Sequence, residues 1–247
     1  RGSSLRAPEN SMAAIELAIA EGADFVEIDV QETADGEIVV FHDKDFKRLA
    51  GDDRSIWNIT TEELAEIDIG SSHDPPLPGA RVPLLAEVIQ ATKGKVKLNV
   101  ELKFNGHDEE LVKRVIAVIR DLDAQEQCVI SSLDQQGLKQ VRSLAPEIKT
   151  GMITAVSIGD LSKTDADFLS VSASRVDLKL VQAAHRRGKE VHAWTVNDTK
   201  TANRLIDMGV DNLLTDDPAM MVELRNQRAA LSTSERLLLQ SHRWLAD

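Results

Sequence analysis

The chain has a single cysteine in 247 residues and far fewer basic than acidic side chains. A lone thiol cannot form an internal disulfide, and the apolar neighbours Val129 and Ile130 predict that Cys128 is buried. With 29 Lys and Arg residues against 41 Asp and Glu residues, the formal net charge is -12. A surface this acidic argues against nucleic acid or an anionic membrane as its main partner.

Long apolar runs are also missing. No stretch approaches the ~18 consecutive apolar residues of a membrane span, and no signal peptide is visible. The sequence starts at Arg1 rather than at a methionine, so we expect it to be a fragment of a longer protein. The 42% hydrophobic content still permits a large core, in one α/β domain or in two smaller ones.

Helices and strands are predicted to alternate along most of the chain. Gly22, Gly188 and Gly209 each end a predicted helix before a short loop leads into a strand. The predicted strands are 25–30, 97–103, 128–132, 149–153, 167–171, 190–196 and 212–215, and the main helices are 11–21, 83–89, 108–122, 134–144, 177–187 and 199–208. This alternation predicts a parallel sheet, and this many units predict an α/β fold of the (β/α)8 TIM-barrel type.

Seven strands are one fewer than such a barrel needs. The eighth should precede the first predicted helix and end at Arg1, so we expect the first strand to lie largely upstream of residue 1. It should pair with the strands 25–30 and 212–215, which would otherwise keep unpaired edges. It should also place Arg1 at the barrel mouth, close to Glu27 and Glu101.

Two segments depart from the barrel pattern. Residues 44–83 are polar and interrupted by prolines, which indicates a small insertion after the second barrel strand. After a barrel domain over residues 1–223, a basic tail follows at 224–247, in which Ser232 and Glu235 match a capping box that would open a helix. This helix could pack on the barrel, or it could contact a membrane surface or a second copy of the chain.

Two acidic residues lie side by side on the strand at 25–30. Glu27 and Asp29 are two positions apart and therefore project from the same face, where they repel each other unless a cation or a proton lies between them. A tight turn and a return strand at 37–41 bring His42 back beside them. An acid pair with a histidine delivered next to it indicates an active site.

Further functional side chains are predicted at the carboxyl ends of other strands, where TIM-barrel active sites lie. Glu101 and Lys103 share one face of their strand, Arg1 ends the first strand, and Trp194 lies on a later one. Three carboxylates suit a hard divalent cation, Mg²⁺ or Ca²⁺, whereas a lone cysteine and the lack of a histidine pair argue against zinc. Arg1 and Lys103 would attract a phosphate, and His42 would act as a general acid or base.

Each of these assignments has a structural alternative. Glu27 and Asp29 could form a salt-bridged strand face, and Lys103 could do no more than pair with Glu101. His42 alone could cap a turn.

The aromatic and loop residues leave more choices open. Trp194 could be a core aromatic instead of a substrate contact, and His192, which alternates with it, could line the barrel or reach the site. Glu9 could face the site, while Asn10 could face it or cap the following helix.

Several short motifs follow one another along nearly the whole chain. They are Arg1-Gly2-Ser3-Ser4, Ala7-Pro8-Glu9-Asn10-Ser11, Gly22-Ala23-Asp24, Glu27-Ile28-Asp29-Val30, Asp35-Gly36, His42-Asp43, Glu101-Leu102-Lys103 and Ala193-Trp194-Thr195-Val196-Asn197. As an ordered set they resemble the glycerophosphodiester phosphodiesterase family from residue 1 to about 222. The resemblance implies a (β/α)8 barrel in which the insertion at 44–83 helps to contact the glycerol group.

The resemblance also implies a role for each site residue. The metal ligands would be Glu27, Asp29 and Glu101. Arg1 and Lys103 would bind the phosphate, with Arg1 also taking part in catalysis, and His42 would be one of two catalytic histidines. The second histidine would immediately precede Arg1.

The implied activity is the metal-dependent hydrolysis of glycerophosphodiesters to glycerol 3-phosphate and an alcohol. The same barrel could instead act on lysophospholipids, or it could be a catalytically silent phosphodiester-binding domain. The residues of the motifs are most similar to those of a bacterial subgroup of this family, whose catalytic domain follows an N-terminal membrane region. We therefore expect a soluble bacterial domain that an upstream segment, or the tail, could attach to a membrane.

Overall fold

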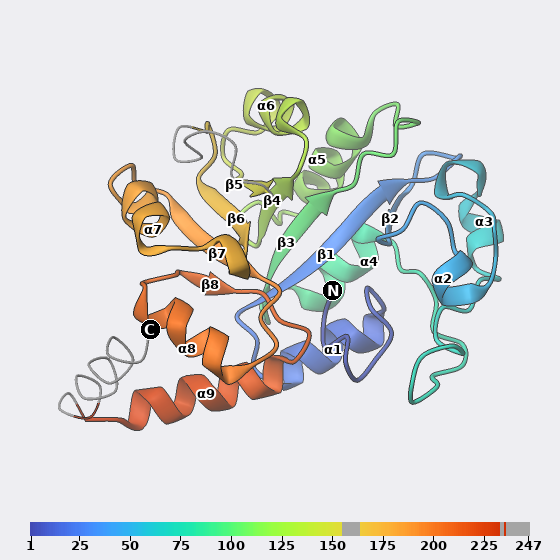
Figure 1. Ribbon diagram of the computed structural model, residues 1–247. Helices are drawn as coiled ribbons and strands as arrows, with labels where there is room; N and C mark the ends of the chain where they lie inside the picture. The colour runs from blue at the N-terminus through green and yellow to red at the C-terminus, as the bar shows by residue number, and fades with distance from the viewer. Residues whose placement is uncertain (155–163, 233–234, 236–247) are drawn as a thin grey trace.

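The computed structural model describes residues 1–154, 164–232 and Glu235, and its centre is one curled sheet (Figure 1). Its strands are β1 (Phe25–Glu32), β2 (Ile38–Val40), β3 (Lys97–Leu102), β4 (Cys128–Ser132), β5 (Thr150–Thr154), β6 (Phe168–Ser172), β7 (Glu190–Trp194) and β8 (Asn212–Leu213), in the order β2-β1-β3-β4-β5-β6-β7-β8. Neighbouring strands are parallel except for β1 and β2, which are antiparallel. A curled, mostly parallel sheet confirms the predicted α/β fold of the TIM-barrel type.

Helices surround the curled sheet (Figure 1). They are α1 (Met12–Ala20), α4 (Leu85–Thr92), α5 (Leu111–Asp121), α6 (Gln135–Leu144), α7 (Leu178–His185), α8 (Thr199–Asp207) and α9 (Pro218–Ala230). Many begin where the sequence supplies a capping side chain, because Ser11, Asp134, Asp177, Asp198 and Asp217 each accept a hydrogen bond from a backbone N–H three residues later. The predicted helices agree with these bounds to within a few residues, and α9 is an addition.

Apolar residues fill the space between the sheet and the helices. Val26, Ile28 and Val30 of β1 belong to one buried cluster with residues of α1, α4 and α5. Because side chains alternate across a strand, burying these three residues on the outer face turns Glu27 and Asp29 to the inside of the sheet. Core packing therefore decides where the acidic pair lies.

The described strands do not close the sheet. In this part of the chain β8 pairs with β7 alone, and β1 pairs with β2 only through residues 30–32. A pocket of about 750 Å³ opens between Phe25 on β1 and Leu213 on β8 and continues up to the carboxyl ends of the strands. The first strand upstream of Arg1 stays a prediction, and the gap lies where that prediction puts it.

The segment at residues 44–83 lies beside β2 and carries three short helices (Figure 1). These are α2 (Lys47–Ala50), the 3-10 helix η1 (Ile56–Asn58) and α3 (Thr61–Leu64). Although the segment is polar overall, Phe46, Ile56 and Ile59 are fully buried and pack in one cluster with Phe41 at the end of β2. This small core attaches the segment directly next to His42.

The basic tail starts inside a helix. α9 extends from Pro218 to Ala230 and so crosses residue 224, and Leu224 is buried. Arg225 lies 2.6 Å from Asp24, and Arg228 lies 2.6 Å from Asp207 on α8. The first residues of the tail are therefore packed on the barrel.

The predicted capping box is present just after this helix. The backbone N–H and the hydroxyl of Ser232 donate to the carboxylate of Glu235, and the backbone N–H of Glu235 donates back to Ser232. The helix predicted to follow it lies outside the described residues. Among the helices that the structure does describe, none is long and apolar enough to cross a membrane.

Candidate active site

Three carboxylates meet at the carboxyl ends of two adjacent strands. The parallel register of β1 and β3 places Asp29 opposite Glu101, and Glu27 lies two residues earlier on the same face of β1. One carboxylate oxygen from each of the three lies within 4.8 Å of the others. Asp29 is fully buried, and the other two are mostly buried. The predicted acidic residues are thus brought together.

Burial and mutual repulsion make this cluster costly to ionise. Burial, reinforced by Asp29, raises the pKa of Glu27 above its usual range, although the guanidinium of Arg1 opposes the shift. Burial and Asp29 likewise raise the pKa of Glu101 to about 7, with Lys103 opposing. Because three like charges share one buried site, a bound cation would stabilise the ionised form of the cluster.

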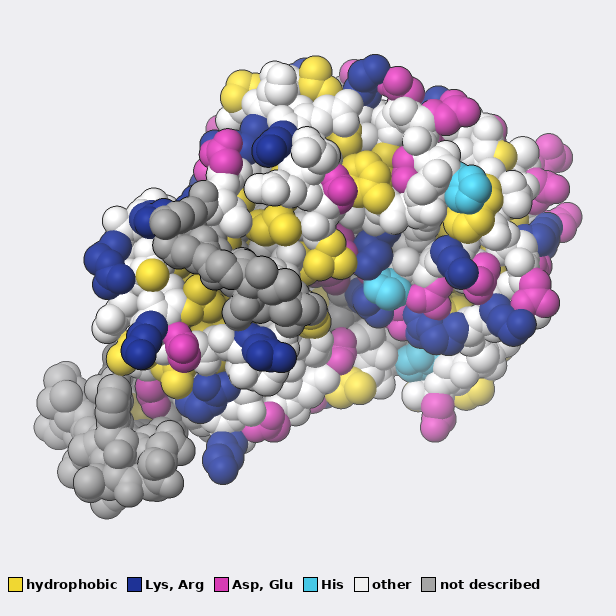
Figure 2. Space-filling view, turned by 45° about the horizontal axis from the view of Figure 1, so that its top comes forward, with side chains coloured by type: hydrophobic (Ala, Val, Ile, Leu, Met, Phe, Trp, Pro, Cys, Tyr) yellow, Lys and Arg dark blue, Asp and Glu magenta, His cyan; other side chains and the backbone are white. Residues whose placement is uncertain are grey.

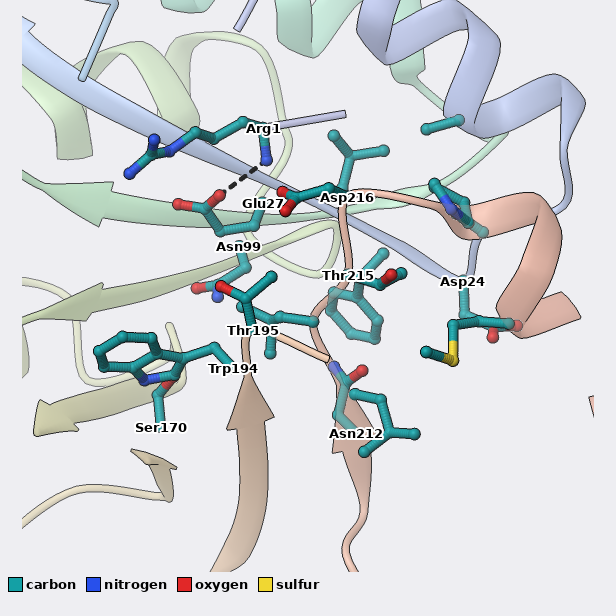
Figure 3. Close-up of a pocket in the computed structure, with 18 of the residues that line it drawn as sticks. Arg1, Asp24, Glu27, Asn99, Ser170, Trp194, Thr195, Asn212, Thr215 and Asp216 are labelled. Atoms are coloured by element: carbon teal, nitrogen blue, oxygen red, sulfur yellow. Dashed lines mark hydrogen bonds and ion pairs between the residues drawn. The ribbon is translucent and has the colours of Figure 1, made fainter. Parts of the chain in front are cut away.

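Two cationic side chains flank the carboxylates. The guanidinium of Arg1 lies 3.0 Å from Asp29 through Nε and 3.1 Å from Glu9 through one Nη. Lys103 lies 3.0 Å from Glu101 and 3.7 Å from Asp29. Figure 3 shows the backbone nitrogen of Arg1 next to the Glu27 carboxylate, 2.8 Å from it. The predicted closeness of residue 1 to Glu27 is confirmed.

Gly2 permits this placement of Arg1. Its φ is +77°, and a Cβ at this position would lie 2.5 Å from the backbone carbonyl carbon of Ala14. Only glycine adopts such a backbone conformation readily and allows so close an approach to α1. The residue after Arg1 must therefore be small for the guanidinium to reach the site.

The carboxylate cluster fits a hard divalent cation. The Oδ1 atom of Asp29 is buried and has no hydrogen-bond partner among the described residues. A buried, unpartnered carboxylate oxygen that faces two further carboxylates is suited to coordination. Oxygen atoms alone, without thiolate or imidazole in the cluster, match the preference of Mg²⁺ and Ca²⁺.

His42 lies on the rim of the same pocket. Its Nδ1 lies 2.6 Å from Oδ1 of the adjacent Asp43, so Nε2 is the ring nitrogen available to a reacting group. In the space-filling view, basic side chains and a histidine gather at the centre of this face, with hydrophobic side chains next to them (Figure 2). An imidazole, two cationic side chains and two carboxylates of the site therefore line one pocket.

The opposite wall of the pocket is uncharged. Trp194 at the end of β7 and Ser170 on β6 line it, facing Glu27 across the opening (Figure 3). The indole Nε1 of Trp194 is buried and has no partner in the described part of the chain.

His192 lies deeper than the site. It stacks on Phe168 with ring centroids 4.2 Å apart, and its Nε2 lies 3.1 Å from Glu190 at the start of β7. Burial lowers the pKa of its imidazole. It does not line the pocket, so the barrel-lining alternative is the one that the structure supports.

Asn10 supports the acidic cluster instead of capping α1. Its side chain donates to Asp29 Oδ2 at 2.9 Å and accepts from the Asp29 backbone N–H at 3.3 Å, while Ser11 is the cap. Its φ of +59° is in the left-handed region, where asparagine is tolerated. The sequence left this choice open because both roles suit an asparagine before a helix.

Sequence reasoning missed two charged residues of the site. Arg48 donates to Asp43 and to Glu9, and Asp43 engages His42. The available signal for Asp43 was its position directly after a candidate catalytic histidine. Nothing in the spacing of Arg48 set it apart from the other basic residues of a polar insertion.

Known proteins resemble the chain in sequence and in fold. A family model described as the glycerophosphoryl diester phosphodiesterase family matches residues 1–220. A glycerophosphodiester phosphodiesterase of Caldanaerobacter subterraneus subsp. tengcongensis is 31% identical over 234 residues, covering 91% of this chain and 95% of the relative.

Solved structures agree with this match. A phosphodiesterase of Oleispira antarctica, in complex with the product sn-glycerol-3-phosphate, has a TM-score of 0.86 and 30% identity, covering 92% of this chain and 94% of that one. A glycerophosphodiester phosphodiesterase of Agrobacterium tumefaciens has a TM-score of 0.76 and 26% identity, covering 89% of this chain and 95% of that one.

The residues matched by the family model, 1–220, include all of the motifs on which the resemblance was based. The relatives are covered over most of their own length, so the similarity is that of whole domains. The chain therefore belongs to the glycerophosphoryl diester phosphodiesterase family, an enzyme family of phosphoric diester hydrolases, as its motifs predicted.

Proposed function

We propose that this protein hydrolyses glycerophosphodiesters to sn-glycerol 3-phosphate and an alcohol, using Mg²⁺ or Ca²⁺. The observation that carries the proposal is the meeting of three carboxylates, Glu27, Asp29 and Glu101, with two cationic side chains, Arg1 and Lys103. Acidic ligands beside fixed positive charges suit a metal ion and a phosphodiester that share oxygen atoms. The similar O. antarctica enzyme, whose structure holds sn-glycerol-3-phosphate, supports the substrate class.

The residues of the site divide the reaction between them. Glu27, Asp29 and Glu101 would hold the cation, which when bound polarises the phosphate and lowers the pKa of the attacking hydroxyl or water. Arg1 and Lys103 bind the phosphate and offset the negative charge that develops during bond breaking.

Proton transfer belongs to His42. Because Asp43 engages Nδ1, the proton moves at Nε2, toward the leaving oxygen or away from the attacking one. Trp194 lies on the uncharged wall and contacts the part of the substrate that carries no charge.

A strand preceding Arg1 would complete this site. The unpaired edge of β8 in the described chain, the short pairing of β1 with β2 and the pocket between them support a strand that pairs with both. The family resemblance implies that such a strand ends in a second catalytic histidine directly before Arg1. A protein extended by its own upstream residues should unfold at a higher temperature and turn over faster, and an unchanged midpoint would contradict the proposal.

A lysophospholipid is the second candidate substrate. Leu133 lines the pocket and is 56% exposed, and Phe104 on the neighbouring strand end is 41% exposed. An apolar rim of this kind could accommodate an acyl chain. The phosphate and metal contacts would be the same for both substrates.

The test is a substrate panel with and without chelator. We expect release of sn-glycerol 3-phosphate from glycerophosphocholine, and we expect EDTA to abolish it and added Mg²⁺ or Ca²⁺ to restore it. Turnover limited to lysophosphatidylcholine would favour the second substrate class. Binding of glycerophosphocholine without any turnover would favour a silent phosphodiester-binding domain, and turnover unaffected by EDTA would contradict the metal assignment.

A further inference from the structure

A chain of charged side chains connects His42 with Arg1 at the mouth of the sheet. Arg48 Nε donates to Asp43 Oδ2 at 2.6 Å, while Asp43 Oδ1 lies 2.6 Å from His42 Nδ1. The two Nη atoms of Arg48 donate to the two carboxylate oxygens of Glu9, each at 2.8 Å. Glu9 in turn accepts a hydrogen bond of 3.1 Å from Arg1. Both groups proposed to act on the phosphodiester are thus tied to one guanidinium.

The planar guanidinium of Arg48 suits this task. It presents its donors in a fixed fork, so it can hold two carboxylates in one relative orientation, which a lysine ammonium cannot do. Hydrogen bonds to Glu9 and then Asp43 hold the pKa of Arg48 above its usual range. Burial by itself would raise the pKa of Glu9 and of Asp43. The hydrogen bonds from Arg48 outweigh it and keep both pKa values below their usual range. All three groups are therefore charged at neutral pH.

The three groups come from separate parts of the chain. Glu9 belongs to the loop before α1, Asp43 follows β2, and Arg48 lies on α2 in the segment at 44–83. No other chemistry is evident for Arg48, because its polar contacts in the described structure all go to these two carboxylates. A surface ion pair alone contributes little to stability, so the geometry points to a role in the site.

We propose that Arg48 is a positioning residue for the hydrolysis. It holds the Asp43 carboxylate where it accepts the Nδ1–H of His42, and Glu9 anchors Arg48 to the loop of Arg1. The imidazole is thereby kept in the tautomer whose Nε2 is free to move a proton. This assignment rests on the proposed function, since it concerns the same reaction.

The chain offers a matched control in the same segment. Arg54 also forms a fork with a carboxylate, at 2.7–3.1 Å from Asp52, but it contacts neither Asp43 nor Glu9. Arg48→Met and Arg54→Met therefore remove equivalent charges at similar exposure, 48% and 42%. Arg48→Lys keeps the charge and loses the fork, and it serves if the methionine variant does not fold.

The first readout needs no substrate. Nitrogen-15 NMR of the histidine rings in the full-length protein reports which ring nitrogen carries the proton, and His42→Gln identifies the His42 signals. We expect Nδ1–H in the native protein and in Arg54→Met, and loss of this single tautomer in both Arg48 variants. An unchanged His42 spectrum in the Arg48 variants would overturn the proposal, whether or not the protein hydrolyses any diester.

The second readout is kinetic. With glycerophosphocholine and Ca²⁺ or Mg²⁺, we expect Arg48→Met to lower kcat by ~10–100-fold with little change in KM, Arg48→Lys to fall in between, and Arg54→Met to match the native protein. Adding Arg48→Met to Asp43→Asn should cost nothing further, because both act on His42 through one contact. Additive losses, or a full kcat in Arg48→Met, would show that Arg48 does not act through Asp43. Inactivity of the native protein would count against the proposed function and leave the NMR result to decide the positioning role.

Discussion

The two halves of the curled sheet contribute different chemistry to the same pocket. The half formed by β1, β2 and β3 supplies Glu27, His42, Glu101 and Lys103 to its lining, and the fully buried Asp29 belongs to the same carboxylate cluster. The half formed by β5, β6 and β7 supplies side chains without charge, among them Ser170 and Trp194. In a glycerophosphodiester the phosphate is charged and the glycerol group is not, and this division suits such a molecule.

The halves also differ in the contacts that their polar side chains make. On the charged half, Asp29 is bonded to Asn10 and Arg1, and His42 is held through Asp43. On the uncharged half, the indole nitrogen of Trp194 has no partner within the described residues. Preorganised charges are what phosphoryl chemistry needs, because donors and acceptors that are already oriented need no reorganisation during the reaction.

The largest effect should follow a break in the charged half. Asp29→Asn removes the fully buried member of the acidic cluster, so we expect kcat/KM for glycerophosphocholine to fall roughly 10³-fold, as when several kcal/mol of charge stabilisation is lost. Glu190→Gln, a carboxylate at the start of β7 outside the pocket, should leave the rate unchanged. Turnover above a tenth of the native rate in Asp29→Asn would show that the reaction does not depend on the charged half of the sheet.

A pH titration tests the same half through its electrostatics. Because the pKa of Glu101 is raised to about 7, the metal-free site carries a proton below that pH which a cation must displace. Apparent affinity for Ca²⁺ or Mg²⁺, measured by calorimetry, should therefore fall as pH drops below about 7, by up to ~10-fold per unit for one proton.

Glu101→Gln is the control for this titration. It should bind the cation more weakly and lose the part of the pH dependence that Glu101 causes. Native affinity that is constant between pH 5.5 and 7 would argue that Glu101 is already ionised or is not a ligand.

A substitution on the uncharged half should have a smaller and different effect. Trp194→Ala removes a side-chain contact of ~1 kcal/mol, so we expect KM to rise about fivefold while kcat changes little. Trp57→Ala is a suitable control, because Trp57 stacks on His107 and does not line the pocket. A large loss of kcat in Trp194→Ala would show that this half also takes part in the chemistry.

The smallest effect is expected from shortening the tail. A truncation after Leu231 should leave glycerophosphocholine hydrolysis unchanged, because none of the site residues lies beyond it. Truncation at residue 224 should instead lower the unfolding temperature, since it removes buried Leu224 and the contact of Arg228 with Asp207. If the protein truncated after Leu231 selectively loses lysophosphatidylcholine hydrolysis, the tail would be assigned to a lipid substrate. If it loses vesicle binding, the tail would be assigned to a membrane.

Much of the charged half could be predicted from the sequence, because strand geometry is local. Two-residue spacing places Glu27 with Asp29, and Glu101 with Lys103, on one face whatever the rest of the fold does. A short hairpin then returns His42 to the same end. Alternating helices and strands likewise predicted the parallel sheet, since each unit carries its own hydrophobic period and helix stop.

The sequence by itself thus determined the type of fold and the acidic, cationic and imidazole groups of the site. Tertiary structure alone decided how these groups are supported. Asn10 reaches Asp29 through a left-handed backbone conformation, and Arg48, which lies 39 residues after Glu9, joins Glu9 to Asp43. Such contacts depend on how loops and an insertion pack against the strand ends, and no local periodicity encodes that packing.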